Sequence, residues 1–224
     1  MNHHIPRIYL PDIRTNLSND QKHHLCKVLK LRNGDNIYVF DANENEYTAT
    51  LNGNMLNITD KIKSIKTLPK HIVLYCAITK GIYFRNIVRF AVEMGVHTLQ
   101  PVITDHVVCK PPVSHKVKKH IISATEQCGR VNIMKYNSPI HFYDAFETDQ
   151  NTFICDETVQ YHSQKPLYEI FSTLKTIHLM IGPEGGFSEK ELFYKKNNLH
   201  RISISPFILR VDTAVAVSIG YALQ

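Results

Sequence analysis

The sequence lacks the patterns that mark secreted, membrane-spanning or disulfide-rich proteins. Its five cysteines are scattered and form no C-x-x-C pair, so neither a disulfide framework nor a zinc cage is indicated. The N-terminus has no charged segment followed by an apolar one, and we expect no secretory signal. No apolar run reaches membrane-spanning length. We therefore expect a protein of the reducing cytoplasm with no membrane partner. Cys76 and Cys155 lie within apolar runs, and we expect both to be buried thiols.

Several ligand-binding and catalytic motifs are absent as well. Neither G-x-G-x-x-G nor G-x-x-x-x-G-K-[ST] occurs, which argues against a Rossmann dinucleotide site and a P-loop. A G-x-S-x-G nucleophile elbow is also missing. The thirteen histidines include His3-His4 and His23-His24, but their spacing matches no metal-ligand pattern, so we expect no metal.

Length and charge set the broad class of protein. With 224 residues the chain can form one large domain and one small one. Apolar residues make up 43% and charged residues 21%, which is typical of a soluble globular protein. The formal charge of +6 and the sequence pI near 9.0 favour a polyanionic partner, although such a balance can also serve solubility alone.

The pattern of predicted strands and helices changes near residue 68. Before it, turn formers such as Asn52-Gly53-Asn54 separate short runs that predict strands over 7–10, 36–41, 47–51 and 55–65 and one helix over 21–29. These runs indicate a small barrel domain over 1–68, with Leu68-Pro69 as the linker.

From 69 to 224, strands and helices alternate. The pattern predicts strands over 72–78, 97–103, 152–155, 177–181 and 201–204, and helices over 82–94, 113–128, from Ser188 onward, and over 213–223. Such alternation is typical of an α/β domain with a largely parallel sheet. Ser188 and Glu191 form a capping box at a helix start. The last helix is apolar on all sides, so we expect it in the core, at a subunit interface, or in both.

Two segments near the C-terminus carry the most information. Ile181 to Ser188 reads Ile-Gly-Pro-Glu-Gly-Gly-Phe-Ser, and Ile208 to Ala214 reads Ile-Leu-Arg-Val-Asp-Thr-Ala. Both follow predicted strands, at the edge where parallel α/β domains bind ligands. By itself the first segment is also compatible with a plain strand-to-helix turn. Side by side, the two loops can surround a small cofactor with backbone amides and carbonyls.

With these segments the sequence strongly resembles the RsmE family, which uses S-adenosylmethionine to methylate N3 of a uridine in 16S ribosomal RNA. The resemblance covers nearly the whole chain. It rests on His24-Leu25, Val28 to Arg32 with Gly34-Asp35, Glu93 to Val96, Glu126 to Arg130, Ile181 to Phe187 and Ile208 to Arg210. The family belongs to the SPOUT class. The resemblance implies a PUA-like RNA-binding β-barrel, an α/β methyltransferase domain tied in a trefoil knot, a homodimer, and 16S rRNA in the assembled small subunit as partner.

The resemblance also implies a cofactor site for S-adenosylmethionine between the two loops. Apolar walls with backbone polar groups suit its adenine. Thr213 either bonds the cofactor or merely belongs to the first turn of the last helix. The other cofactor-binding residues implied are Leu179, Ile181, Gly182 and Gly186 on one side and Ile204, Ser205, Ile208 and Leu209 on the other.

Arg210 and Glu184 are the expected catalytic residues. Arg210 is always protonated and cannot act as the base, but it can stabilise negative charge on a uracil carbonyl as the N3 proton leaves. Glu184 or Asp212 can accept that proton, directly or through water. Alternatively, Asp212 caps the last helix and Glu184 only favours a nearby helix N-terminus.

Contacts to RNA are expected from basic side chains. The second loop departs from the family pattern at two positions. Ser205 stands where the family usually has a glycine, and Phe207 where it has an arginine. Two alternative functions stay open. One is a SPOUT ribose 2′-O-methyltransferase, and the other, suggested by Ser205 and Phe207, is an RNA-binding homologue that has lost activity. The RNA-binding residues we expect are Arg7, Lys30, Arg32 and Arg130.

Overall fold

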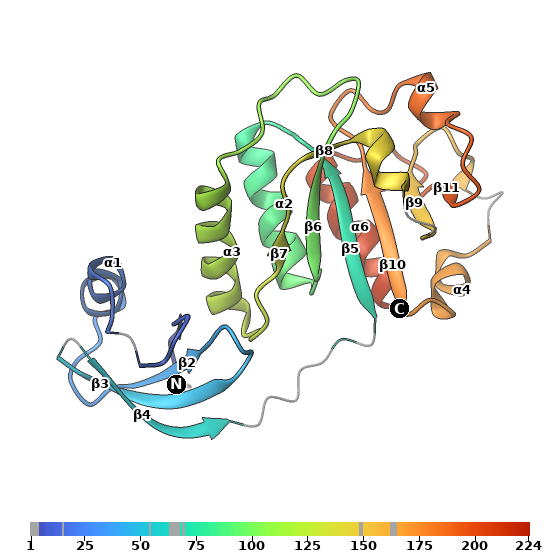
Figure 1. Cartoon of the computed structure of the whole chain (residues 1–224). Coiled ribbons are helices and arrows are strands. Elements are labelled where there is room, and N and C mark those ends of the chain that lie inside the picture. Colours follow the sequence, from blue (N-terminus) through green and yellow to red (C-terminus); the bar gives the residue numbers. More distant parts are fainter. Residues whose placement is uncertain are drawn as a thin grey trace. The chain divides into compact units, whose positions relative to one another are not determined.

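The computed structural model describes residues 5–14, 16–53, 55–62, 68, 70–147, 150–161 and 165–224. The chain forms two compact units (Figure 1). Unit 1 consists of Met1–Thr67 together with Ile122–Ile133, and unit 2 of Leu68–Ile121 and Met134–Gln224. Pro69 of the expected linker lies outside the described residues.

Within the described residues, unit 1 holds a four-stranded sheet in the order β1-β2-β3-β4. The pair β1–β2 is parallel, and the pairs β2–β3 and β3–β4 are antiparallel. Alternate residues such as Ile37, Val39, Ala49 and Leu51 point into its core. The elements are β1 (Arg7–Tyr9), α1 (Asn19–His23), the π-helical turn η1 (His24–Val28), β2 (Asn36–Phe40), β3 (Glu46–Asn52) and β4 (Met55–Ile62).

The helix expected over 21–29 is two elements. It starts earlier, at Asn19, because Ser18 and Gln21 form a capping box at its N-terminus. From His24 the turn widens to the π-helical η1. The last strand of this unit was expected to reach residue 65, but residues 63–65 lie outside the described part.

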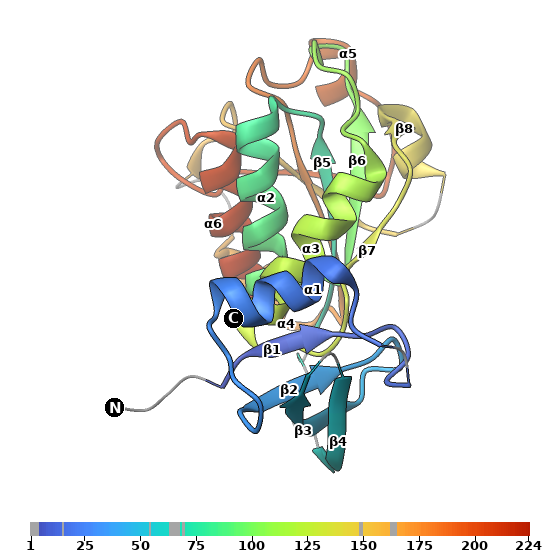
Figure 2. The same ribbon diagram turned by 90° about the vertical axis from the view of Figure 1, so that its left-hand side faces the viewer.

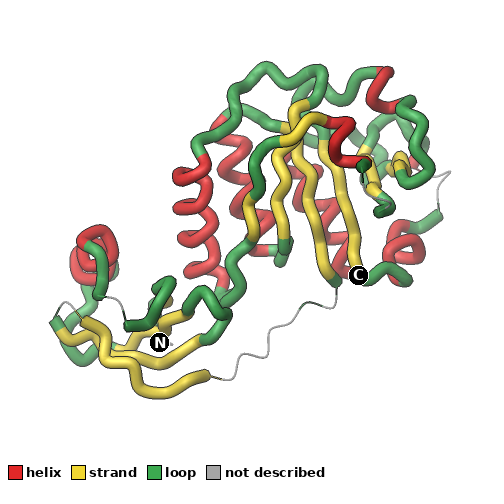
Figure 3. Tube along the Cα trace, in the orientation of Figure 1, coloured by secondary structure: helices red, strands yellow, loops and turns green. Residues whose placement is uncertain are grey.

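The sheet of unit 2 has seven strands among the described residues, in the order β11-β9-β10-β5-β6-β7 with β8 also beside β6. Every one of these pairs is parallel. Together with the helices beside the sheet (Figure 3), this confirms the predicted α/β class. The elements are β5 (His71–Ala77), α2 (Gly81–Glu93), β6 (Thr98–Ile103), α3 (Ser114–Cys128), β7 (Lys135–Tyr136), β8 (Ile140–His141), the 3-10 helix η2 (Phe142–Phe146), β9 (Thr152–Cys155), α4 (Leu167–Ser172), β10 (Thr176–Ile181), α5 (Glu189–Leu192), β11 (Leu199–Ile202) and α6 (Val211–Leu223).

Helices α2 and α6 lie side by side against one face of this sheet (Figures 1 and 2). The face of α6 that points inward is buried through Val215, Ser218, Ile219 and Ala222. Its other side, which includes Ala216, is only half-buried. Within this chain the last helix is therefore buried on one side, as expected of a helix that lies in the core, and its expected place at a subunit interface stays a prediction.

Three boundaries at the end of the chain differ from the predictions. Strand β11 begins at Leu199, two residues before its predicted start. Strand β11 ends at Ile202 rather than at residue 204, because the chain bends there: the Ser203 hydroxyl donates to the Ser205 carbonyl at 3.1 Å. Ile204 consequently belongs to the loop. Helix α6 begins at Val211, two residues earlier than predicted, which puts Asp212 inside its first turn.

Candidate functional site

The two loops singled out in the sequence enclose one pocket of about 390 Å³ in unit 2. Strands β10 and β9 are neighbours in the sheet, and β11 pairs with β9, so the carboxyl ends of all three meet at this edge. The residues lining the pocket are Tyr83, Cys155, Asp156, Glu157, Ile181, Gly182, Pro183, Glu184, Gly186, Phe187, Ser203, Ile204, Ser205, Phe207, Ile208, Leu209, Arg210, Val211 and Ala214.

The glycine-rich loop follows β10 directly. Its turn closes where the Gly186 N–H donates to the Pro183 carbonyl at 2.9 Å. Gly186 has φ +67°, in the left-handed region that favours glycine. At Gly182 a Cβ atom would lie 3.0 Å from the ring of Phe187, so glycine lets that ring pack against the backbone. These two positions require glycine for different reasons, one for its backbone angle and one for space.

The second loop is held by Ser205. Its hydroxyl accepts a hydrogen bond from the Phe207 N–H at 3.0 Å. The φ angle of Ser205 lies outside the positive region, so the backbone here does not depend on the glycine that the family usually carries. After this loop Phe207 and Ile208 stand out into solvent, 77% and 84% exposed, while both also line the pocket.

Most of the expected cofactor-binding residues do meet at the pocket. Leu179 and Thr213 are outside its lining: Leu179 is fully buried within β10, and Thr213 is exposed on the first turn of α6. The expected residues that line it are Ile181, Gly182, Gly186, Ile204, Ser205, Ile208 and Leu209.

Both expected catalytic side chains lie on the pocket wall. Arg210 is exposed and is the N-cap residue of α6, where its side chain makes no capping hydrogen bond with the described residues. Glu184 is exposed in the glycine-rich loop, and its Oε1 accepts from the Lys80 N–H at 3.4 Å. A permanent cation and a carboxylate thus face the same cavity from two separate loops.

Asp212 does not cap the last helix, contrary to one reading of the sequence. Because α6 begins at Val211, Asp212 is the second residue of the helix. Its Oδ2 accepts a hydrogen bond from the Asn86 side chain on α2 at 2.9 Å. Its Oδ1 accepts from the Thr213 N–H at 3.1 Å. Asp212 therefore ties α6 to α2 and lies outside the pocket lining.

Sequence reasoning missed four polar residues of the pocket, of which one is Ser203, in the turn after β11. Asp156 and Glu157 follow β9, and Tyr83 belongs to the first turn of α2. Asp156 is 3% exposed and forms an ion pair with Arg201, so its charge is balanced within the protein. Glu157 is exposed and adds a second carboxylate to the pocket lining, besides that of Glu184. The rule that ligands bind at carboxyl ends of parallel strands, applied to β9, would have found Asp156 and Glu157.

The two cysteines expected to be buried differ from each other. Cys76 is fully buried, and burial raises the pKa of its thiol to about 12. Cys155 is partly exposed because it faces the pocket. Burial, with the neighbouring Asp156 carboxylate, raises the pKa of the Cys155 thiol as well. Both thiols therefore stay protonated near neutral pH, and neither is an activated nucleophile.

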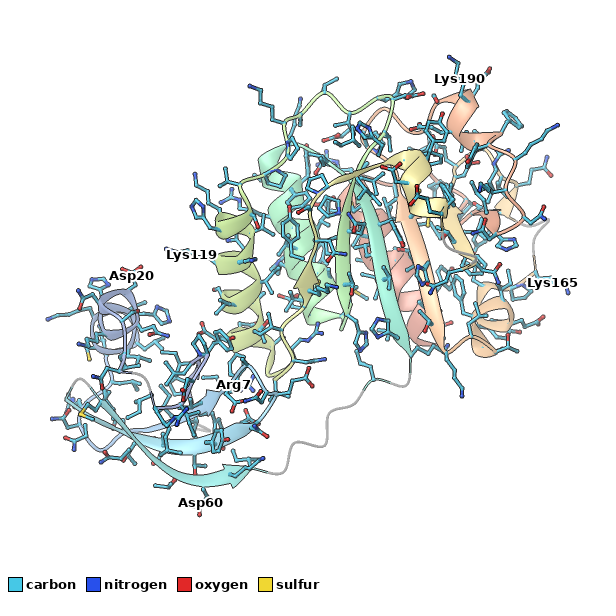
Figure 4. The ribbon with its side chains drawn as sticks, viewed as in Figure 1. Arg7, Asp20, Asp60, Lys119, Lys165 and Lys190 are labelled. Atoms are coloured by element: carbon cyan, nitrogen blue, oxygen red, sulfur yellow. The ribbon has the colours of Figure 1, made fainter. Side chains whose placement is uncertain are left out.

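The four expected RNA contacts fall into two groups, and all four lie in unit 1. Arg7, labelled in Figure 4, is buried: its Nε donates to Glu46 Oε1 at 2.9 Å, and Nη1 donates to the Arg130 carbonyl at 3.2 Å. Arg130 is 9% exposed, and burial lowers the pKa of its guanidinium. Lys30 and Arg32, by contrast, are exposed at the end of η1.

Among the described residues, the structure shows neither a metal-binding group nor a membrane-spanning helix. No group of three or more histidine, cysteine, aspartate or glutamate side chains is gathered as for a metal ion. No helix in the part of the chain that the structure describes has the length and apolar character needed to cross a membrane.

Comparison with family models matches most of the chain. Residues 66–223 match the model described as an RNA methyltransferase domain, and residues 17–54 match the RNA methyltransferase PUA domain. Among solved structures, a ribosomal RNA small subunit methyltransferase E from Neisseria gonorrhoeae bound to S-adenosyl methionine is 25% identical, with a TM-score of 0.83 over 97% of this chain and 96% of that one. A putative methyltransferase from Legionella pneumophila, solved with bound SAM, is 24% identical with a TM-score of 0.84 over 98% of this chain and 97% of that chain, and shows the fold alone.

Curated relatives extend the match along the full length. The ribosomal RNA small subunit methyltransferase E of Buchnera aphidicola (from Acyrthosiphon pisum) is 32% identical over 247 residues, covering 100% of this chain and 94% of that protein. The protein of the same name from Aquifex aeolicus is 31% identical over 156 residues, covering 67% of each chain. The matched domains and the full-length relative agree with the sequence resemblance, and the chain therefore belongs to the RsmE family, the ribosomal RNA small subunit methyltransferases E.

Proposed function

We propose that this protein transfers the methyl group of S-adenosylmethionine to N3 of a uridine in 16S ribosomal RNA. The proposal rests on one observation: the glycine-rich loop and the loop after β11 bring Arg210 and Glu184 to the same pocket. Membership of the family supports it, as does the relative from Neisseria gonorrhoeae that holds S-adenosyl methionine.

The residues of the pocket fit this cofactor. Ile181, Ile204 and Leu209 offer an apolar wall, and Gly182 and Gly186 add backbone polar groups to the lining, as suits an adenine. The carboxylates of Glu157 and Glu184 suit a ligand that carries a sulfonium and an ammonium group. When bound, S-adenosylmethionine supplies an electrophilic methyl carbon. We assign cofactor binding to those residues expected from the sequence that line the pocket, with the addition of Glu157.

Arg210 and Glu184 have different roles in the reaction at the uracil base. The uridine has to be unpaired or extruded for its N3 to reach the pocket. The guanidinium of Arg210 holds a uracil carbonyl and stabilises the negative charge that develops as the N3 proton leaves. Glu184 accepts that proton, directly or through one water. Asp212 is a weaker candidate, because both its oxygens already accept hydrogen bonds outside the pocket.

RNA binding falls to exposed groups of both units. We assign phosphate contacts to Lys30 and Arg32, and leave Arg7 and Arg130 to the packing of unit 1, where their side chains are buried. In unit 2 the exposed ring of Phe207 is the kind of platform on which an unpaired base stacks. The RNA-binding domain extends over residues 1–68 and the methyltransferase domain over 69–224. The substrate is the assembled small subunit in the cytoplasm.

We also keep the homodimer and the trefoil knot that the family resemblance implies. The half-buried side of α6 is apolar and rich in small residues, including Ala216 and Gly220, which suits close packing against a second copy. Sedimentation of the purified protein at micromolar concentration tests the dimer; a single species at the 25.8 kDa mass of one chain would contradict it.

The function itself is tested in two steps. Calorimetric titration first measures whether the purified protein binds S-adenosylmethionine; no binding by the folded protein would favour an inactive RNA-binding homologue. The protein is then incubated with S-adenosylmethionine and small subunits from cells that lack the enzyme, and the nucleosides are mapped by mass spectrometry. We expect one new methyl group on a uracil base. A methyl group on a ribose would instead indicate 2′-O-methylation.

A further inference from the structure

A loop that none of the site predictions includes contacts the glycine-rich loop directly. This loop, residues 104–113, joins β6 to α3 within unit 2. We name it the β6–α3 loop. Its contacts involve two neighbouring residues, Asp105 and His106, and each reaches a different part of the segment 185–191.

Asp105 anchors the β6–α3 loop to the start of α5. Glu191 is completely buried, and its carboxylate accepts hydrogen bonds from the Ser188 N–H at 2.8 Å and the Asp105 N–H at 2.9 Å. The Ser188 hydroxyl donates to Asp105 Oδ2 at 2.6 Å. Neighbouring Lys190, by contrast, points into solvent (Figure 4). The capping box predicted from Ser188 and Glu191 is thus also the attachment point of a second loop.

His106 reaches the glycine-rich loop itself. Its Nδ1 lies 3.0 Å from the Gly185 carbonyl and 3.2 Å from the Gly186 carbonyl. Because both partners are acceptors, the tautomer that fits carries its proton on Nδ1 and donates. The two carbonyls belong to the turn in which Gly186 adopts φ +67°, so the donor holds the most conformationally free part of the pocket wall.

We propose that His106 is a positioning residue that fixes the glycine-rich loop in its cofactor-binding shape, with Asp105, Ser188 and Glu191 holding His106 in place. The inference rests on the proposed function. Its physical basis is preorganisation: a loop with two adjacent glycines loses much conformational freedom on ligand binding, and a donor that already restrains it lowers that loss. His106 does not line the pocket, and its hydrogen bonds to the described pocket wall go to this loop, so we assign it no part in the chemistry.

Two substitutions separate the hydrogen bond from the bulk of the side chain. In His106→Asn the amide nitrogen can donate from nearly the position of Nδ1, whereas His106→Leu fills similar space without a donor. We expect His106→Leu to weaken S-adenosylmethionine binding about fivefold in calorimetry, and His106→Asn to stay within about twofold. The value of kcat at saturating cofactor should change little in both. His115→Leu, an exposed histidine on α3, is the matched control and should bind as the unchanged protein does.

Hydrogen exchange of the cofactor-free protein gives a second measurement that does not need activity. We expect faster exchange over residues 182–187 in His106→Leu than in His106→Asn, with equal melting temperatures for the two. Equal affinity in both variants, or an equal loss in both, would overturn the proposal. If the unchanged protein binds no S-adenosylmethionine, the proposed function fails, while the exchange comparison still decides the role of His106.

Discussion

Arg210 is the residue on which the proposed chemistry depends most. Arg210 lines the pocket, is exposed and makes no side-chain capping bond with the described residues, so removal of its side chain should leave the fold intact. We predict that Arg210→Ala lowers the single-turnover rate of methyl transfer by about 10²–10³-fold, the usual effect of losing one donor to a developing oxyanion. Binding of S-adenosylmethionine should change far less. Turnover close to that of the unchanged protein would remove Arg210 from the mechanism.

Phe207 offers a direct reporter of base binding, because the chain contains no tryptophan. We predict that the fluorescence of Phe207→Trp is quenched when a uridine-containing RNA binds, as a base stacks on the indole. Phe207→Ala should weaken RNA binding by about 1–3 kcal/mol. Phe193→Trp is the control: Phe193 is 68% exposed, lies outside the pocket and packs under the Arg201 guanidinium at 5.2 Å. An equal response of both tryptophans would contradict stacking at Phe207.

At the scale of single residues, chemistry was easier to predict from the sequence than burial. Arg210 and Glu184 were identified by residue type and by their place in two motifs, and both line the pocket. Arg7 was chosen because a guanidinium suits phosphate, yet its side chain is buried against Glu46 and backbone carbonyls over a hundred residues away. No local pattern shows that a given arginine has such partners.

At the scale of the element, the glycine-rich loop has two adjacent glycines, Gly185 and Gly186, that differ in backbone conformation. Gly186 has φ +67°, whereas the φ of neighbouring Gly185 lies outside the left-handed region, and an added Cβ there would have the His106 side chain nearest to it, at 3.4 Å. We predict that Gly186→Ala costs about 1–2 kcal/mol of stability and weakens S-adenosylmethionine binding. Gly185→Ala should stay within about 0.5 kcal/mol. Denaturant unfolding and calorimetry measure both; equal losses would show that the backbone angle is not the cause.

Some element boundaries were predicted from local signals, although the capping box of Ser18 and Gln21 at the start of α1 was missed. The start of α5 was predicted from its capping box, and the end of α2 from Gly95, which indeed has φ +83°. The end of β11 was predicted two residues too late, because Ile204 is apolar like a strand residue. The bend is stabilised instead by the Ser203 hydroxyl, a side-chain contact that apolar periodicity does not register.

For the molecule as a whole, a buried histidine predicts how stability depends on pH. His178 is 6% exposed, lies over Tyr75, and neither ring nitrogen has a hydrogen-bond partner in the described part of the chain. Burial, and secondly the charge of His71, lower its pKa below the ordinary value of 6.5. Between the lowered pKa and 6.5 the unfolded chain binds more protons than the folded one, so stability is lost as the pH falls below about 6.5.

We therefore predict that the melting temperature falls between pH 7.5 and pH 5.5, and that His178→Phe reduces this fall. Phenylalanine keeps the ring packing over Tyr75 without a group that titrates. Thermal unfolding followed by circular dichroism at both values measures it. An identical fall in His178→Phe would assign the pH dependence to the other histidines of the chain.

The sequence by itself determined the α/β class, the longer strands and helices and the two loops of the site, whereas the short elements β7, β8, η2 and α4 were not predicted. Periodicity, caps and glycine positions act over a few residues and can be read locally. Only the tertiary structure decided that Asp156, Glu157 and Tyr83 join the pocket and that Ile122–Ile133 belongs with unit 1. It also brought His106 to carbonyls 79 and 80 residues away. Such contacts form when distant segments pack together, and no spacing within either segment encodes which partner it meets.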